Sequence, residues 1–208
     1  MTEHKKKPLI VIVGPTAVGK TSVSIDLAKR LNGEIVSADS RLLYRGMDIG
    51  TAKPSKDEQS GVPHHLIDVA DPNERWSLAI YQREAYRIIN DIQARDKMPF
   101  LVGGTGQYIR SIIEGWHIPP QRPDYALREA LNNWADKIGS EGIYEGLRLL
   151  DPQAAEKIDY RNQRRTVRAL EVIFKTGQRF SDLRRKQECP YQPIILGIER
   201  SREDLYER

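Results

Sequence analysis

The sequence has 208 residues, enough for one large domain or a core with a modest insertion. Its net charge of +4 is only mildly basic, so a surface that binds nucleic acid would have to come from local clustering of positive charge. The single cysteine, Cys189, excludes an internal disulfide framework and is typical of a reducing cytosol. No apolar run approaches the ~20 residues of a membrane span, and the polar N-terminus contains no signal segment, so we expect a cytoplasmic protein without membrane contact.

Strand-like runs alternate with helical segments along the chain. The runs are Leu9–Val13, Glu34–Ser37, His65–Val69, Pro99–Val102 and Pro193–Ile198. Amphipathic helices are predicted over Lys20–Leu31, whose inward stripe would consist of Val23, Ile25, Leu27 and Leu31, and over Ser77–Ala94. This order predicts an α/β fold of the P-loop type, in which a parallel sheet is flanked by helices.

The stretch from Trp116 to Gln187 contains helical segments and no convincing strand, which indicates an all-helical insertion. Proline-rich connectors flank it on both sides. The predicted division is 1–116 for a P-loop core, 117–188 for the insertion and 189–208 for a return to the core. A last helix is expected to begin near Ser201.

A phosphate-binding motif lies directly after the first strand and opens the first helix. It consists of Gly14, Pro15, Thr16, Ala17, Val18, Gly19, Lys20 and Thr21. The glycine-rich turn lets backbone N–H groups point into one concavity, Lys20 adds a positive charge, and Thr21 offers a hydroxyl to Mg²⁺. The N-terminus of the helix adds a partial positive charge at the same place. The motif predicts bound phosphates, but it leaves open whether they belong to a nucleotide.

Asp39 follows the second strand, and the carboxyl ends of parallel strands share the edge of the sheet at which the P-loop lies. The pattern alone allows three roles for this carboxylate: acid–base catalysis, support of Mg²⁺, or capping of the next turn.

Four motifs in order carry a resemblance to a known family. They are Gly14–Ala17, Asp39–Pro54, Pro63–Asp68 and Leu101–Gly106, and Arg164–Val172 extends the match. Together they closely resemble the bacterial tRNA dimethylallyltransferases, also called tRNA isopentenyltransferases, along the whole chain. Members of that family usually continue further, so the resemblance implies a C-terminally truncated form.

The resemblance implies transfer of a dimethylallyl group from dimethylallyl diphosphate to the exocyclic N6 amine of the adenosine immediately 3′ of a tRNA anticodon. It implies Mg²⁺ as cofactor, held partly by Thr21, and the tRNA anticodon stem-loop as partner. The implied catalytic residues are Asp39 as general base, Thr16, Lys20 and Thr105. The implied tRNA-binding residues are Asp39, Ser40, Arg41, Leu42, Thr105, Arg128, Arg164, Arg165, Thr166, Val167 and Arg168.

Positive charge is concentrated in the insertion. Residues 161–186 contain nine basic and two acidic side chains, a balance of +7 against +4 for the whole chain. A basic run is often only a solvated helix face, but arginines at helical spacing also suit a line of phosphates. We therefore expect RNA contact here and a monomer that admits a large RNA.

Three other functions compete with prenyl transfer to tRNA. A P-loop small-molecule kinase with a helical lid would explain the phosphate motif and a basic insertion, but it gives Asp39–Pro54 no purpose. A nucleotide-switched RNA-binding module would require binding of a nucleoside triphosphate, which nothing in the sequence demands. Prenylation of free adenine nucleotides would leave the long basic insertion without a use.

Overall fold

The structure is a computed structural model that describes residues 6–51, 53–118, 123–183, 187–201 and 203–204. The chain divides into two compact units, one formed by residues 1–115 with 187–208 and the other by residues 116–186. The two places where the chain leaves and re-enters the first unit are adjacent, because the Gln187 N–H donates to the Gly115 carbonyl oxygen at 2.7 Å.

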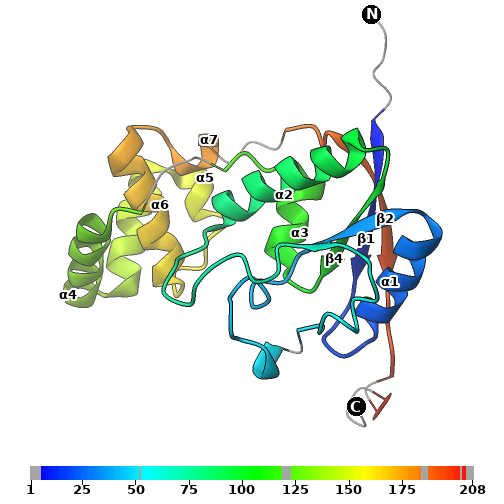
Figure 1. The fold of residues 1–208 in the computed structure, drawn as a ribbon. Coiled ribbons are helices and arrows are strands. Elements are labelled where there is room, and N and C mark those ends of the chain that lie inside the picture. Colours follow the sequence, from blue (N-terminus) through cyan, green and yellow to red (C-terminus); the bar gives the residue numbers. More distant parts are fainter. Residues whose placement is uncertain (1–5, 52, 119–122, 184–186, 202, 205–208) are drawn as a thin grey trace, which may run out of the picture. The chain divides into compact units, whose positions relative to one another are not determined.

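The first unit contains a parallel sheet, which confirms the predicted P-loop type of fold (Figure 1). Its strands are β1 (Lys7–Val13), β2 (Gly33–Ser37), β3 (His64–His65), β4 (Met98–Gly103) and β5 (Tyr191–Gly197). Their order across the sheet is β3-β2-β4-β1-β5, and every pairing is parallel. Parallel neighbours need crossover connections, so helices must cover the faces of the sheet.

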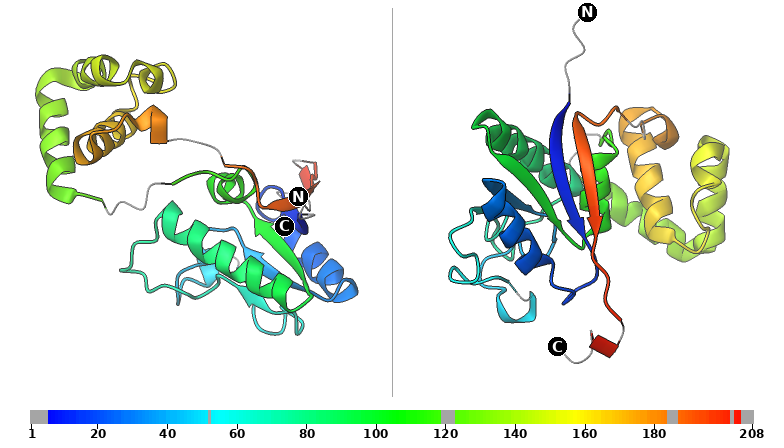
Figure 2. Two further views of the ribbon diagram at one scale, coloured as in Figure 1. Left: turned by 90° about the horizontal axis from the view of Figure 1, so that it is seen from above. Right: turned by 90° about the vertical axis from the view of Figure 1, so that its right-hand side faces the viewer.

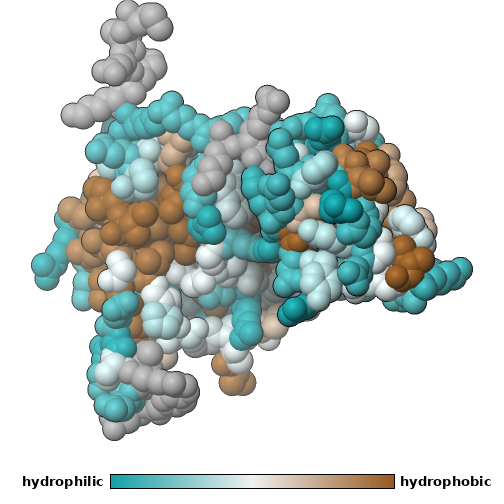
Figure 3. Space-filling view, turned by 180° about the vertical axis from the view of Figure 1, so that it is seen from behind, coloured by the Kyte–Doolittle hydropathy of each residue, from teal (hydrophilic) through white to brown (hydrophobic). Residues whose placement is uncertain are grey.

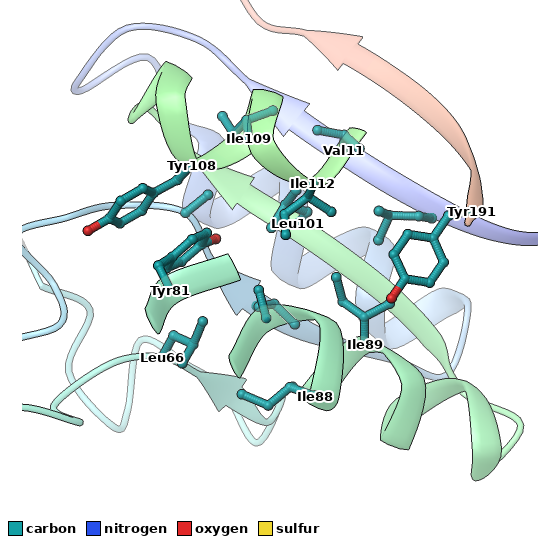
Figure 4. Packing of buried hydrophobic residues seen from close by; sticks show 14 of the residues in the cluster. Val11, Leu66, Tyr81, Ile88, Ile89, Leu101, Tyr108, Ile109, Ile112 and Tyr191 are labelled. Carbon is teal, nitrogen blue, oxygen red and sulfur yellow. The ribbon is translucent and has the colours of Figure 1, made fainter. Parts of the chain in front are cut away.

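Three helices cover the sheet, and the alternation of side chains along β1 shows which face each helix covers. Leu9 and Val11 pack with α2 (Leu78–Ala94) and α3 (Gly106–Ile113), as the labelled cluster in Figure 4 shows. Ile10 and Ile12 point to the opposite face, where they pack with α1 (Lys20–Arg30). Both faces of β1 are therefore buried, as is usual for an inner parallel strand.

The third predicted strand is much shorter than expected. The run His65–Val69 was predicted to be extended, but β3 ends at His65. Leu66 and Asp68 have φ angles of 59° and 55°, and such left-handed residues cannot continue a strand. After the strand ends, the Asp68 N–H donates instead to the Leu42 carbonyl oxygen at 3.0 Å.

The inward stripe predicted for the first helix is wrong at both ends. Val23 and Leu31 are 39% and 47% exposed. The face that packs on the sheet consists of Ser24, Ile25 and Ala28.

The sheet ends on one side in a strand with exposed apolar side chains. β5 pairs with β1 alone, and Ile194, Ile195 and Leu196 are 48%, 53% and 40% exposed. Figure 3, which views the molecule from behind, shows an apolar area on this part of the first unit. An apolar edge strand of this kind can pair with other chains.

The named secondary-structure elements in the described part of the second unit are all helices (Figure 2). Its helices are α4 (Tyr125–Leu150), α5 (Pro152–Ala155), α6 (Gln163–Thr176) and α7 (Phe180–Leu183). Gly139, with φ of 79°, divides α4 into two helical parts. The core includes Leu131, Ile143, Leu147 and Leu170, so the unit has an apolar centre of its own. Within the described residues of both units, no helix has the length and hydropathy needed to cross a membrane.

Candidate active site and RNA-binding helix

The P-loop joins β1 to α1, and the side chain of its own lysine, Lys20, folds back onto the loop backbone. Lys20 Nζ donates to the carbonyl oxygens of Gly14 and Pro15 at 3.0 and 2.7 Å. Gly19 has φ of 101° and directly precedes α1, a conformation that favours glycine. A Cβ atom at Gly14 would lie 2.5 Å from the Ile198 carbonyl oxygen, so a side chain there would collide with the chain after β5.

Burial lowers the pKa of Lys20, and the carboxylate of Asp39 partly offsets this effect. Lys20 follows β1 and Asp39 follows β2, and both strands belong to the same parallel sheet. The phosphate-binding cation and the predicted general base therefore lie on the same edge of the sheet, as expected for the carboxyl ends of parallel strands.

The ends of β2 and β4 are joined by hydrogen bonds. The Thr105 N–H donates to the Ala38 carbonyl oxygen at 3.0 Å, and the Ser40 N–H donates to Thr105 Oγ1 at 3.0 Å. Thr105 occupies the N-cap position of α3, yet its hydroxyl does not cap that helix. It fixes instead the start of the segment that carries Asp39.

Asp39 accepts a hydrogen bond from the Arg41 N–H at Oδ1, at 2.9 Å. This local turn fixes the carboxylate through one oxygen, and among the described contacts its other oxygen accepts no bond. Arg41 is exposed, whereas Asp39, Ser40 and Leu42 are half-buried. A partly buried carboxylate with one unbonded oxygen can accept a proton from a bound amine.

Two glycines allow the close approach of these segments. A Cβ atom at Gly103 would lie 2.3 Å from the Ala38 carbonyl oxygen, so only glycine fits there without movement. A Cβ atom at Gly104 would lie 3.7 Å from the Gly14 carbonyl oxygen, which is an ordinary contact. The backbone at the end of β4 thus lies against the end of β2 on one side and against the P-loop on the other.

Sequence reasoning missed Tyr108, on the first turn of α3. Its ring stacks on Tyr81, with ring centroids 3.8 Å apart and planes at 11°. The Tyr81 hydroxyl donates to the Ser37 carbonyl oxygen, and the Tyr108 hydroxyl points the other way (Figure 4). Burial raises the pKa of Tyr108 to about 12, and electrostatic interaction with Tyr44 and Asp39 adds to this.

Two cations organise the neighbourhood of the site, and sequence reasoning assigned no role to either of them. Lys53 lies in the long segment after β2, and its side chain is only 5% exposed. Its Nζ pairs with Asp48 at 2.7 Å and with Asp68, which ties the two halves of that segment together. Arg200 Nε donates to the Val18 carbonyl oxygen of the P-loop at 3.1 Å.

The predicted RNA-binding residues of the second unit fall into three groups. Arg164 and Arg165 are exposed in the first turn of α6. Thr166 and Val167 are 0% and 4% exposed, so in this structure their side chains belong to the core of the unit. Arg128 and Arg168 are both paired with Glu171. An RNA contact by any of them stays a prediction.

The first turn of α6 is positively charged. Its first turn contains no acidic residue, although acidic side chains are favoured there, and it carries Arg164 and Arg165 instead. Asn162 caps the helix by accepting a hydrogen bond from the Arg165 N–H at 3.1 Å. Two exposed cations at the N-terminus of a helix make this turn suitable for an anion.

The residues around the P-loop suit Mg²⁺, although among the described residues no group of three or more His, Cys, Asp or Glu could hold a metal. Mg²⁺ usually binds one or two protein oxygens, waters and substrate phosphates and needs no complete cage of side chains. The exposed hydroxyl of Thr21 and the half-buried carboxylate of Asp39 are donors of that kind. Thr16, also exposed, offers a further hydroxyl within the loop.

Two protein-family models match the chain, "IPP transferase" at residues 42–208 and "Isopentenyl transferase" at residues 7–71. The tRNA dimethylallyltransferase of Herpetosiphon aurantiacus is 53% identical over 203 residues, a match that covers 97% of this chain and 64% of the relative. The tRNA dimethylallyltransferase of Thermomicrobium roseum is 48% identical over 205 residues, covering 99% and 62%. The chain thus spans a little less than two thirds of the length of these curated relatives.

Solved structures agree with the sequence matches. The full-length tRNA isopentenylpyrophosphate transferase of Bacillus halodurans superposes with a TM-score of 0.63 at 45% identity, covering 98% of this chain and 63% of that chain. A eukaryotic dimethylallyltransferase acting on tRNA superposes with a TM-score of 0.79 at 30% identity, covering 97% and 50%. With a P-loop sheet, a matching family model over most of its length and relatives near 50% identity, this chain belongs to the IPP transferase family.

Proposed function

We propose that this chain transfers the dimethylallyl group of dimethylallyl diphosphate to the N6 amine of the adenosine immediately 3′ of a tRNA anticodon. The names of its relatives support the substrate class. The observation that carries the proposal is that Lys20 and Asp39 both lie at the edge of the parallel sheet where β1 and β2 end. A phosphate-binding cation beside a carboxylate suits the release of a diphosphate and the removal of a proton.

The P-loop would bind the diphosphate of the donor. As the allylic C–O bond breaks, negative charge develops on the departing diphosphate, and the loop N–H groups with Lys20 stabilise it. The Lys20 ammonium now bonded to the Gly14 and Pro15 carbonyls would turn to the phosphate oxygens. Mg²⁺, when bound near Thr21, would neutralise further charge on the leaving group.

Asp39 would act on the acceptor. The N6 nitrogen forms a bond to the allylic carbon, the bond from that carbon to the diphosphate oxygen breaks, and one N6 proton passes to Asp39. A general base of this kind contributes about 10²–10⁴-fold in rate. Thr105 holds the Ser40 N–H and so keeps the segment after Asp39 in place. The adenine must leave its stack to reach this edge, because a stacked base hides its amine.

The basic start of α6 would hold the RNA backbone. Phosphate contacts orient the substrate without reading its sequence, and they make binding depend on salt. Arg164 and Arg165 are the exposed cations for this role. Binding by a monomer in the cytoplasm is part of this proposal.

The test is to incubate the chain with unmodified tRNA and Mg²⁺, adding either dimethylallyl diphosphate or ATP, and to weigh the digested nucleosides. We expect one adenosine to gain the mass of one dimethylallyl group with the prenyl donor and no change with ATP. RNA and donor that both bind but give no such gain would contradict the proposal. A phosphorylated product from ATP would favour the kinase alternative.

A further inference from the structure

A buried carboxylate in the second unit holds two arginines at once. Glu171, on α6, is 0% exposed, and its Oε2 accepts from Arg128 Nε at 2.8 Å and from Arg168 NH1 at 2.6 Å. Its Oε1 accepts from the Asp124 N–H at 2.7 Å, at the residue that caps α4. One side chain therefore fixes both arginines and the start of the neighbouring helix.

The arginines keep donors that Glu171 does not use. Each guanidinium has five N–H donors, and each gives one nitrogen to the carboxylate. Their side chains are 32% and 33% exposed, so the remaining parts reach the surface. The carboxylates of Glu171 and Asp124 balance the charge of the two arginines, and a planar guanidinium with unused N–H groups suits a phosphate.

A further arginine makes the neighbourhood positive. Arg164 lies one turn before Arg168 on the same helix and is exposed. One arginine would neutralise Glu171, so the second one is not needed to balance its charge. Binding of an external anion would therefore stabilise this cluster of arginines.

We propose that Glu171 is a positioning residue that holds Arg128 and Arg168 as one paired site for a phosphate of the RNA backbone. The proposal rests on the proposed function, in which the chain binds tRNA. Arginines held on a buried carboxylate lose less side-chain entropy on binding than mobile ones, so the pair binds more tightly than two free cations.

A purely electrostatic view predicts the opposite result. Replacing Glu171 with glutamine removes one negative charge near the RNA, and simple attraction would then tighten RNA binding. Positioning predicts weaker binding, because the glutamine offers one acceptor oxygen to three donors and the arginines lose their common anchor. The sign of the change therefore decides between the two.

The experiment measures the Kd of the chain for an unmodified anticodon stem-loop RNA, without prenyl donor, over a range of salt concentrations. For Glu171→Gln we expect about tenfold weaker binding and a salt dependence lowered by about one phosphate contact. Glu34→Gln is the matched control, since Glu34 is 2% exposed and pairs with Arg95 and Lys97 in the first unit. It should lower the melting temperature but leave RNA affinity and its salt dependence unchanged.

A second variant covers the case in which Glu171→Gln does not fold. Glu171→Asp keeps the net charge and withdraws the carboxylate by one methylene, and we expect a smaller weakening of the same kind. In a chain with Arg128→Gln and Arg168→Gln, adding Glu171→Gln should weaken RNA binding no further, because no arginine is left to position.

Two results would overturn the proposal. One is unchanged or tighter RNA binding with an unchanged salt dependence in both Glu171 variants. The other is an equal loss of affinity from Glu171→Gln with and without the two arginines. Because the readout is RNA affinity without donor, a failure to transfer the prenyl group would count against the proposed function and leave this result intact.

Discussion

The substitution Gly103→Ala, which adds a single methyl group, tests how closely β2 and β4 must approach each other at the proposed site. The Cβ atom of an alanine there would lie 2.3 Å from the Ala38 carbonyl oxygen and 2.4 Å from its carbon, whereas ordinary contacts begin at 3.4 Å. The backbone of β2 and β4 would have to separate by about 1 Å to remove this overlap. Asp39 follows one of these strands and Thr105 follows the other, so the separation acts directly on the proposed base.

The size of the effect follows from that displacement. Overpacking of this kind costs about 1–3 kcal/mol in unfolding free energy. For a chain of this length we expect the melting temperature to fall by about 5 °C. A shift of about 1 Å at a reacting group lowers the rate about 100-fold. The Gly103→Ala variant should therefore remain folded below its melting temperature but lose most of its kcat for prenyl transfer.

Gly106→Ala is the control for this substitution. Gly106 is the first residue of α3, and a Cβ atom there would meet nothing within 4 Å. Alanine also favours a helix, so this variant should keep its stability and its rate. Both variants would be compared by circular dichroism and by prenyl incorporation at saturating RNA. A Gly103→Ala variant with the rate and melting temperature of the unsubstituted chain would refute the reasoning from strand contact.

Three further predictions concern charged residues. Asp39→Ala should abolish prenyl incorporation while the Kd for RNA stays within about threefold, because the base contributes to the rate; a near-normal rate would remove Asp39 from this role. Arg164→Gln with Arg165→Gln should lower the salt dependence of RNA affinity by about two phosphate contacts, and an unchanged slope in a salt titration would speak against contact. Hydrogen bonds from Arg95 hold the pKa of Glu34 well below its usual 4.5, so its stabilisation is present above pH 4.5 and is lost as pH falls below that. Glu34→Gln should therefore lower the free energy of unfolding by about 2 kcal/mol at pH 7, which is less than for a fully buried pair because the cations of Glu34 reach water. At pH 3 the loss should be smaller. Urea denaturation that shows equal losses at the two pH values would contradict this.

Local features of the chain were predictable from the sequence. The P-loop spacing, the alternation along β1 and the position of Asp39 after a buried strand depend only on residues close together in the chain. Their physical basis is backbone geometry, which acts over a few residues. The α/β fold followed from the order of these local elements.

Contacts between distant residues were not predictable in the same way. The hydrogen bond from Ser40 to Thr105 joins residues 65 apart in the chain, and the stack of Tyr81 on Tyr108 depends on how two helices lie on one face of the sheet. Glu171 shows the same limit. In the sequence it is one acidic residue in a basic run, whereas in the structure it is buried and determines where two arginines lie.

The order of the strands explains why β4 controls the spacing of the proposed site. β4 lies between β2, which leads to Asp39, and β1, which leads to the P-loop. Gly103 leaves no space for a side chain on the β2 side, while Gly104 faces the Gly14 carbonyl oxygen at an ordinary distance. A methyl group at Gly104 should accordingly be tolerated where one at Gly103 is not. The separation of the proposed base from the P-loop thus depends on the backbone contacts of β4 with β2 and with β1.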